Sequence, residues 1–125
     1  MNTQRTFEIK PNYILYTVTG SYLGLIQTLE VFKEITELAE EYEMARVVFD
    51  ITPVKKIPPV MDRYHLGVNA VKIWGNRLKI AIVTKPQEIT GFFENIARHR
   101  GALIKVLPNI NTAESWLGEE HLQSA

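Results

Sequence analysis

Hydrophobic and polar positions follow a period of two at the start of the chain and change to a helical period after residue 20. Residues 6–9 alternate between apolar and polar side chains, which predicts a short strand. Residues 13–19 are rich in β-branched and aromatic types and are apolar on both faces, as is typical of a strand covered on both sides. The short gap between the two strands contains the turn pair Pro11-Asn12 and favours an antiparallel hairpin.

A helix is predicted from Tyr22 to Glu43, with Ser21 as its N-cap. Its apolar stripe consists of Leu25, Leu29, Phe32, Ile35, Ala39 and Tyr42. The opposite face is mostly acidic and consists of Gln27, Glu30, Glu34, Glu37 and Glu41. We interpret this row as a solvated helix face, with a surface for a basic partner as the less favoured alternative.

The stretch 46–50 is apolar up to its final acid, Asp50, and predicts a buried parallel strand. The loop that follows is stiff and basic, because prolines fix φ on both sides of two lysines; its residues include Pro53, Lys55, Lys56, Pro58 and Pro59. A helix then runs to Trp74, and its predicted core stripe is Val60, Tyr64, Val68, Val71 and Trp74. Three apolar side chains lie off that stripe, where they would cover a sheet edge or form a patch that another chain buries: Met61, Leu66 and Ile73.

The last third of the chain predicts two more strands and two more helices. A buried strand at Leu78–Val83 leads into a helix that ends near Arg100, with Thr84 and Gln87 as a capping box. The apolar stripe of that helix is Ile89, Phe93, Ile96 and Ala97. The remaining elements are a short strand at Ile104–Leu107 and a helix that carries Trp116 and Leu117, with Asn111 and Glu114 as its cap.

The element order is therefore ββαβαβαβα, which predicts an α/β fold. Strands separated by helices imply right-handed crossovers, so we expect one mostly parallel five-stranded sheet with an antiparallel edge strand and helices on both faces. The length of 125 residues fits a single domain, with a core at about 6–117 and a tail at 118–125.

The charge balance, the cysteine content and the lengths of the apolar runs argue against several classes of function. Lys plus Arg is 14 and Asp plus Glu is 14, which argues against a nucleic-acid binder, because such domains carry a basic excess. The chain has no cysteine, which excludes disulfides, thiolate catalysis and cysteine-based metal sites. The N-terminus lacks the apolar core of a signal peptide, and no apolar run approaches the about 20 residues of a membrane span. We therefore expect a cytoplasmic protein.

No catalytic or metal motif is found. The histidines are His65, His99 and His121, and no pair of them has metal-ligand spacing, so we predict no metal and no cofactor. The phosphate-loop patterns GxGxxG and GxxxxGK[ST] and the hydrolase pattern GxSxG are absent, so an enzyme is not predicted.

The carboxyl ends of the predicted parallel strands are the place where a site is expected, because ligands of open α/β sheets bind there. Asp50 ends a strand and could serve as a catalytic or Mg²⁺-binding carboxylate, although such sites usually need a second acid, and Asp62 is the nearest in sequence. We favour the alternative in which Asp50 accepts backbone hydrogen bonds from the next loop. The loops at this edge supply hydroxyls, lysines and helix N-termini that could hold an anion, namely Ser21, Asp50, Thr52, Lys55, Lys56, Thr84 and Lys85. Ordinary capping and solvated lysines explain the same residues.

The strings "VVFDIT" (residues 47–52) and "VKKIPP" (54–59), in this order of elements, resemble the STAS domain, in which an "xxLDLS-x-V-x-x-I-D-S-S-G" segment occupies the same place. The later part of the chain looks closest to the SpoIIAA-like (STAS/SEC14-like) branch, whose "A-x-x-W-L" ending is similar to residues 113–117. The resemblance covers about residues 7–117 and implies a regulatory domain rather than an enzyme.

One departure from that pattern bears on function. The anti-sigma-factor antagonists that the chain resembles are switched by phosphorylation of a serine at the start of the second helix. Aligning "VKKI" with the family's "V-x-x-I" places Pro58 at the family's Asp and Pro59 at that serine, so the phosphorylation switch is not carried over. The SEC14-like side of the resemblance implies an apolar ligand, which Met61, Leu66, Trp74 and Phe92 could line, although core packing explains these residues more simply.

Two functions follow as hypotheses. The first is a non-enzymatic regulatory or protein-interaction domain, whose surface comprises Pro58, Pro59, Met61, Leu66 and Ile73 and binds a protein partner or a second copy of the chain. The second is a binding module for a small lipid-like or anionic ligand at the carboxyl edge of the sheet.

Overall fold

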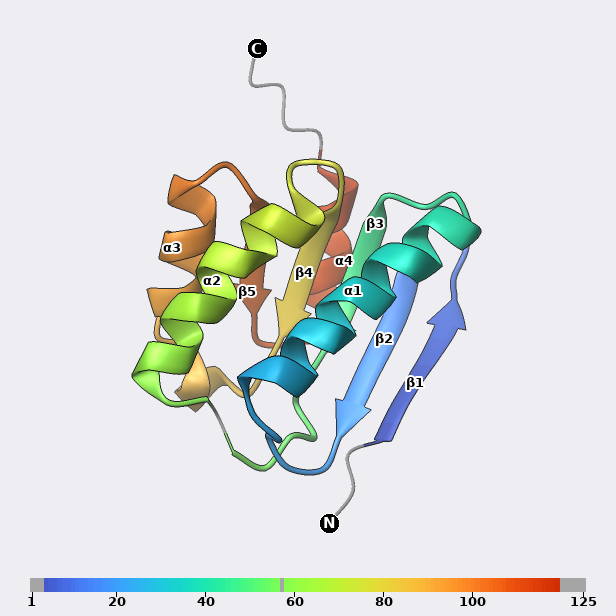
Figure 1. Ribbon diagram of the computed structural model, residues 1–125. Helices are drawn as coiled ribbons and strands as arrows, with labels where there is room; N and C mark the ends of the chain where they lie inside the picture. The colour runs from blue at the N-terminus through green and yellow to red at the C-terminus, as the bar shows by residue number, and fades with distance from the viewer. Residues whose placement is uncertain (1–3, 57, 120–125) are drawn as a thin grey trace.

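The computed structural model describes residues 4–56 and 58–119, and within these residues five strands form one mixed sheet (Figure 1). In sheet order they are β1 (Gln4–Ile9), β2 (Ile14–Thr19), β3 (Arg46–Asp50), β4 (Lys79–Val83) and β5 (Leu103–Leu107). β1 pairs antiparallel with β2, and all the other neighbours are parallel. The predicted α/β fold with an antiparallel edge strand is confirmed. His121 and most of the predicted tail lie outside the described residues.

Helices cover both faces of the sheet, as predicted, but unequally. One face is covered by α1 (Leu25–Glu41), α2 (Val60–Trp74) and α3 (Phe92–His99), and the other by α4 (Ile110–Gly118). In Figure 1, α1 and α2 lie in front of the sheet and α4 lies behind it. The side chains of β2 supply both cores, because Tyr16 packs under α1 and Leu15 lies on the opposite face. This explains why residues 13–19 are apolar on both faces.

Trp74 is at the centre of the larger core, with no exposed surface. Its ring lies 4.3 Å from the ring of Phe32 on α1 and meets the ring of Phe49 on β3 edge-on at 6.5 Å. Its indole N–H donates to the carbonyl oxygen of Phe32 at 3.0 Å, so the one polar atom of this side chain is satisfied. The last residue of α2 therefore joins α1, α2 and the sheet.

Lys79, at the start of β4, holds α4 against the sheet. Its Nζ donates to three carbonyl oxygens at the end of that helix, those of Trp116 (2.8 Å), Leu117 (3.2 Å) and Glu119 (2.7 Å). The ammonium also lies 4.7 Å from the centre of the Trp116 ring. Burial, aided by the charge of Arg46, lowers the pKa of Lys79. The carbonyl groups that a helix leaves unpaired at its C-terminus thus find their donor on a strand.

The buried face of α2 differs from the prediction. Its buried residues are Leu66, Gly67, Ala70 and Trp74, whereas Val60 and Tyr64 of the predicted stripe are exposed. Leu66 is 4% exposed, and Ile73 is partly buried against the core, so neither belongs to an exposed surface patch. The prediction was wrong because α2 packs against both α1 and α3. Its contact with α3 is made at Gly67, which a search for large apolar side chains does not find.

Three helix starts also differ from the prediction. Ser21 is not a cap, since α1 begins at Leu25 after Gly24. The predicted helix from residue 84 to 100 is interrupted: a 3₁₀ turn, η1 (Pro86–Glu88), precedes α3, and Gly91 separates them with φ of 83°. The Thr84 hydroxyl bonds to Glu88 and not to Gln87. The last helix is capped by Asn109, whose side chain accepts from the Thr112 N–H at 2.8 Å, so Asn111 lies inside the helix.

Gly67 lies where α2 packs against α3, and it leaves no room for a side chain. A Cβ atom here would lie 2.8 Å from Cγ2 and 3.0 Å from Cβ of Ile96. We expect Gly67→Ala to lower the free energy of unfolding by about 1–2 kcal/mol, because overpacking costs about 1–3 kcal/mol and alanine returns up to about 1 kcal/mol of helix propensity.

Gly118→Ala is the matched control, since no heavy atom of the described residues lies within 4 Å of its added Cβ. Urea unfolding of the two variants measures the difference. Equal stability of Gly67→Ala and Gly118→Ala would show that the α2–α3 contact has room to spare.

Candidate functional site

The parallel strands β2, β3 and β4 end at the same edge of the sheet, at the bottom of Figure 1. The segments that follow them, residues 20–24, 51–56, 58–59 and 84–91, lie together there. Gly20 forms a parallel bridge with Val54, and its carbonyl accepts from the Lys55 N–H at 2.8 Å. The Lys85 ammonium donates to the Val54 carbonyl at 2.9 Å. We call this end of the molecule, with these three segments and the starts of α1, α2 and α3, the carboxyl-edge pole.

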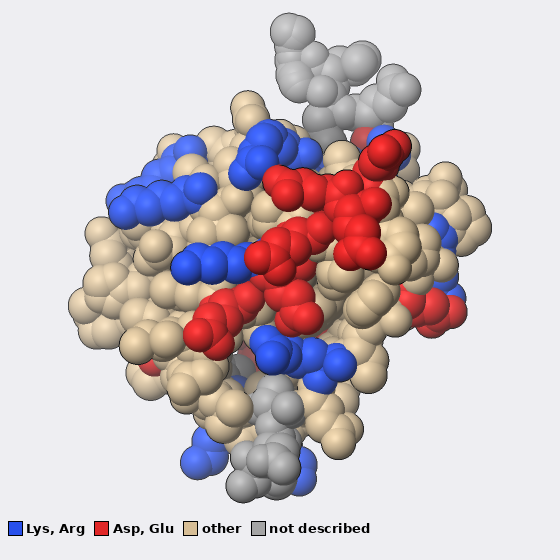
Figure 2. All heavy atoms as spheres, turned by 45° about the vertical axis from the view of Figure 1, so that its right-hand side comes forward, with Lys and Arg blue, Asp and Glu red and all other residues tan. Residues whose placement is uncertain are grey.

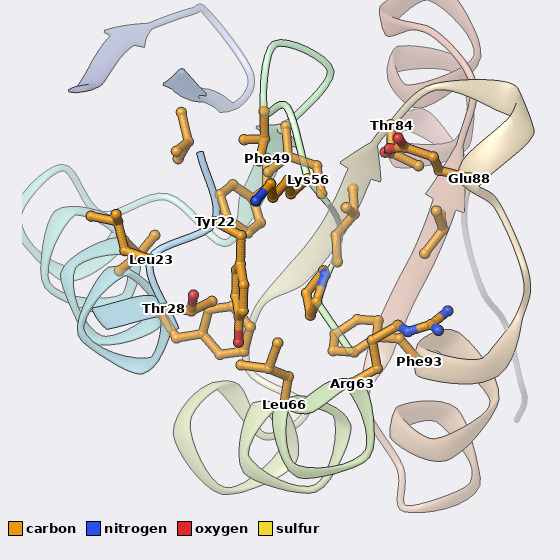
Figure 3. Close-up of a pocket in the computed structure, with 18 of the residues that line it drawn as sticks. Tyr22, Leu23, Thr28, Phe49, Lys56, Arg63, Leu66, Thr84, Glu88 and Phe93 are labelled. Carbon is orange, nitrogen blue, oxygen red and sulfur yellow. The ribbon is translucent and has the colours of Figure 1, made fainter. Parts of the chain in front are cut away.

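A cavity of about 250 Å³ opens between these segments and the three helices (Figure 3). Its walls are mostly apolar and come from the sheet and from all three helices; they include Val18, Phe32, Phe49, Leu66, Ile82 and Phe93. Of the residues predicted to bind a ligand, Ser21, Lys56 and Thr84 line this cavity. Pro58 also lines it, although we predicted that residue for the interaction surface.

Three of the other four predicted ligand residues, Asp50, Thr52 and Lys85, have side chains that form hydrogen bonds within the loops. The Asp50 carboxylate accepts both the backbone N–H of Thr52 at 3.0 Å and its hydroxyl at 2.7 Å, which is the alternative that we favoured for this acid. The Lys85 ammonium donates to the Val54 carbonyl, and the side chain of Lys55 is exposed. Among the described residues, no cluster of three His, Cys, Asp or Glu side chains could hold a metal ion.

Tyr22 lines the cavity, and the sequence analysis did not select it. It stands in a short segment between Gly20 and Gly24, whose φ angles of 104° and 119° favour glycine. Its hydroxyl donates to the Asp62 carboxylate of α2 at 2.9 Å, and burial, followed by this hydrogen bond, raises the pKa of the phenol. In Figure 3 the hydroxyl of Tyr22 is directed toward α2. The two glycines could have indicated a non-helical segment in place of a cap.

Arg63 is a second residue that sequence reasoning missed. It is half-buried in the first two turns of α2, lines the cavity and extends toward the start of α3 (Figure 3). Its Nη1 donates to the hydroxyl of Thr90, in the segment before α3, at 3.3 Å. Its guanidinium carbon lies 6.0 Å from the centre of the Phe92 ring. Its Nε is buried and has no hydrogen-bond partner within the described part of the chain. A pattern of apolar stripes cannot select such a residue, because its role depends on what α3 places beside it.

Large apolar side chains are exposed around the same pole. Six of them stand in the segment before α1 or in the first two turns of α1, α2 and α3: Leu23, Ile26, Val60, Met61, Tyr64 and Phe92. Met61 of the predicted interaction surface is 63% exposed, and Pro59 is also exposed. Of the predicted surface, these two residues are exposed at the pole, beside five other exposed apolar residues. Sequence analysis assigned two of the five to the core stripe of α2 (Val60 and Tyr64), considered Phe92 for lining an apolar ligand, and left Leu23 and Ile26 unassigned.

Figure 2 shows an acidic band across the face on which α1 lies. The helix carries Glu30, Glu34, Glu37, Glu40 and Glu41. Glu34 is not simply solvated, because its carboxylate accepts the Tyr16 hydroxyl and pairs with Arg5 at 3.3 Å. The other carboxylates of the band are exposed, in keeping with the interpretation of a solvated helix face.

Two solved structures share this fold. One is an anti-sigma factor antagonist from Mycobacterium paratuberculosis, with a TM-score of 0.68 and 10% sequence identity over 94% of this chain and 96% of that chain. The other is an uncharacterized protein of the DUF3478 family with a SpoIIAA-like fold from Shewanella loihica PV-4, with a TM-score of 0.51 and 19% identity over 92% of this chain and 93% of that chain. No family model and no curated protein matches the sequence. The chain therefore has the SpoIIAA-like fold that its sequence resembles, and identities this low carry the fold alone.

None of the described helices is long and apolar enough to cross a membrane.

Proposed function

We propose that this SpoIIAA-like chain is a non-enzymatic, cytoplasmic regulatory domain that binds another protein through its carboxyl-edge pole. The observation that carries the proposal is the group of exposed apolar side chains at the starts of α1, α2 and α3, of which Ile26 and Met61 are the most exposed, at 70% and 63%. Exposed apolar groups of this kind are typical of interaction surfaces, because burying them removes apolar area from water.

The fold supports the same proposal. One of its structural relatives is an anti-sigma factor antagonist, which is a protein that regulates through another protein. In this chain α2 begins at Val60 and Pro59 is its N-cap residue, the position at which the resemblance places the phosphorylated serine. Proline has no hydroxyl, so we propose that partner binding here is not switched by phosphorylation of this residue.

Met61→Asp tests the proposed surface. A buried interfacial carboxylate without a partner costs several kcal/mol, so we expect at least a tenfold loss of the partner captured from a cell extract. Leu103→Asp is the control, because Leu103 is also an exposed apolar residue but lies at the start of β5, at the opposite end of the sheet.

The measurement is quantitative mass spectrometry of proteins captured by the wild type and both variants. Capture profiles that are the same for wild type and Met61→Asp would refute the surface. Light scattering on the same samples identifies self-association: if a wild-type dimer separates in Met61→Asp, the partner is a second copy of the chain.

A second candidate function is the binding of a small molecule, and the observation that favours it is the cavity at the carboxyl-edge pole. A mostly apolar cavity with a few polar groups is the usual form of a small-molecule site. Here the polar groups are Lys56, Arg63 and the Thr84–Glu88 pair. Denaturing mass spectrometry of purified protein is expected to release a retained small molecule, and protein that is empty and unstabilised by any amphiphile would count against this function.

A further inference from the structure

We infer that the cavity at the carboxyl-edge pole binds an amphiphile with one anionic group, held by Arg63, and a single apolar tail. This inference rests on the second candidate function, small-molecule binding, and names the chemical class of the ligand.

The walls of the cavity suit a hydrocarbon tail. Val18, Phe49, Ile82 and Val106 project from four neighbouring strands, and Phe32, Leu66 and Phe93 project from the three helices that cover them. The volume of about 250 Å³ is larger than the roughly 150 Å³ that holds benzene in an apolar protein cavity. It is smaller than the roughly 300 Å³ at which drug-sized sites begin, so a single tail of medium length fits better than a two-tailed lipid.

The guanidinium of Arg63 lines the cavity and has hydrogen-bonding capacity left for an anionic group. Its hydrogen bond within the described residues is made by Nη1, to the Thr90 hydroxyl, and Nε has none. The Nε–Nη2 edge is the side of a guanidinium that binds a carboxylate through two parallel hydrogen bonds. Because Nε is buried, an anion paired with it would be less screened by water than a surface ion pair.

The acids that line the cavity do not neutralise Arg63. The Glu94 carboxylate pairs with Arg98 at 3.1 Å and accepts the Val106 N–H at 2.8 Å. The Glu88 carboxylate accepts the Thr84 hydroxyl, and Glu30 is exposed at the margin. No ion pair is formed by Arg63 with any described carboxylate, so an entering anion would supply its missing counter-charge.

Three probes with the same tail and different head groups test the inference: decanoate, 1-decanol and decyltrimethylammonium. Titration calorimetry on the wild type is expected to show that decanoate binds at least tenfold more tightly than decanol, and decyltrimethylammonium more weakly still. Arg63→Gln is expected to bind decanoate no better than decanol. Lys72→Gln, which removes the same charge from an exposed position of α2, is expected to keep the preference.

The possible outcomes distinguish a failure of the anionic head-group assignment from a failure of small-molecule binding itself. If all three probes bind the wild type equally, the cavity is a site for apolar molecules and the anionic head group is wrong. If none binds, the small-molecule function fails as well. If Lys56→Gln removes the preference for decanoate and Arg63→Gln does not, the assignment to Arg63 is overturned. Arg63→Lys is a control for loss of structure in Arg63→Gln. It keeps the positive charge but cannot form the bidentate hydrogen bonds of a guanidinium, and it is expected to bind decanoate with intermediate affinity.

Discussion

Trp74→Ala is expected to lower the free energy of unfolding by about 3–5 kcal/mol, which is the largest effect that we predict for a single substitution. Trp74 is the largest of the fully buried side chains, and its ring contacts those of Phe32 and Phe49. Truncation leaves a cavity where α1, α2 and the sheet meet, and removes the donor to the Phe32 carbonyl. Urea unfolding followed by circular dichroism measures the loss.

Trp74→Phe is the graded control for this prediction. It retains an aromatic ring between Phe32 and Phe49 but lacks the indole N–H that bonds to the Phe32 carbonyl. We expect it to lose clearly less stability than Trp74→Ala. A loss below about 1 kcal/mol for the alanine variant would mean that the site collapses around the gap, and that the larger core does not depend on Trp74.

Lys79→Met is expected to lower the free energy of unfolding by about 2 kcal/mol and to loosen α4 selectively. Methionine fills similar space, but it leaves three carbonyl oxygens at the end of α4 without the donor that Lys79 supplies. The cost is limited because water reaches part of this helix end, and because the variant no longer buries a charge.

Hydrogen exchange is the second measurement for Lys79→Met. α4 is the helix that covers the second face of the described sheet, and its amides should exchange faster in the variant while those of α1 are unchanged. Lys72→Met on the exposed side of α2 is the control, for which no change is expected. A uniform increase across all helices would show that Lys79 supports the whole fold and does not act as a cap for α4.

The element order and sheet arrangement could be predicted because buried strands carry a strong apolar pattern. The strand β4 is buried along its whole length and β3 along its three central residues, and their pairing follows from the crossover rule. Helix boundaries were less predictable. Gly91 interrupts an apolar stripe that continues on both sides of it, and Gly24 lies just before the first stripe, inside the helix that was predicted from Tyr22. The predicted buried face of α2 was wrong because Gly67, a residue without a side chain, makes the contact with α3.

The candidate site could be predicted in position but only partly in composition. Position follows from topology, because parallel strands place their carboxyl ends at one edge. Composition does not, because Tyr22 and Arg63 acquire their partners, Asp62 and Thr90, from other segments of the fold. The favoured prediction for Asp50, that it accepts hydrogen bonds from the next loop, was confirmed, since an acid at a strand end with a hydroxyl two residues later is a local pattern.

The central claim is that the carboxyl-edge pole is the part of this molecule that binds its partner. Hydrogen exchange by mass spectrometry, comparing the free chain with the complex that it captures from a cell extract, tests this claim most directly. We predict new protection in residues 20–28, 52–56, 58–64 and 84–93, where the segments of the pole lie. Protection confined to β1, β5 or α4, with the pole unchanged, would contradict the claim and move the functional surface to another face of the molecule.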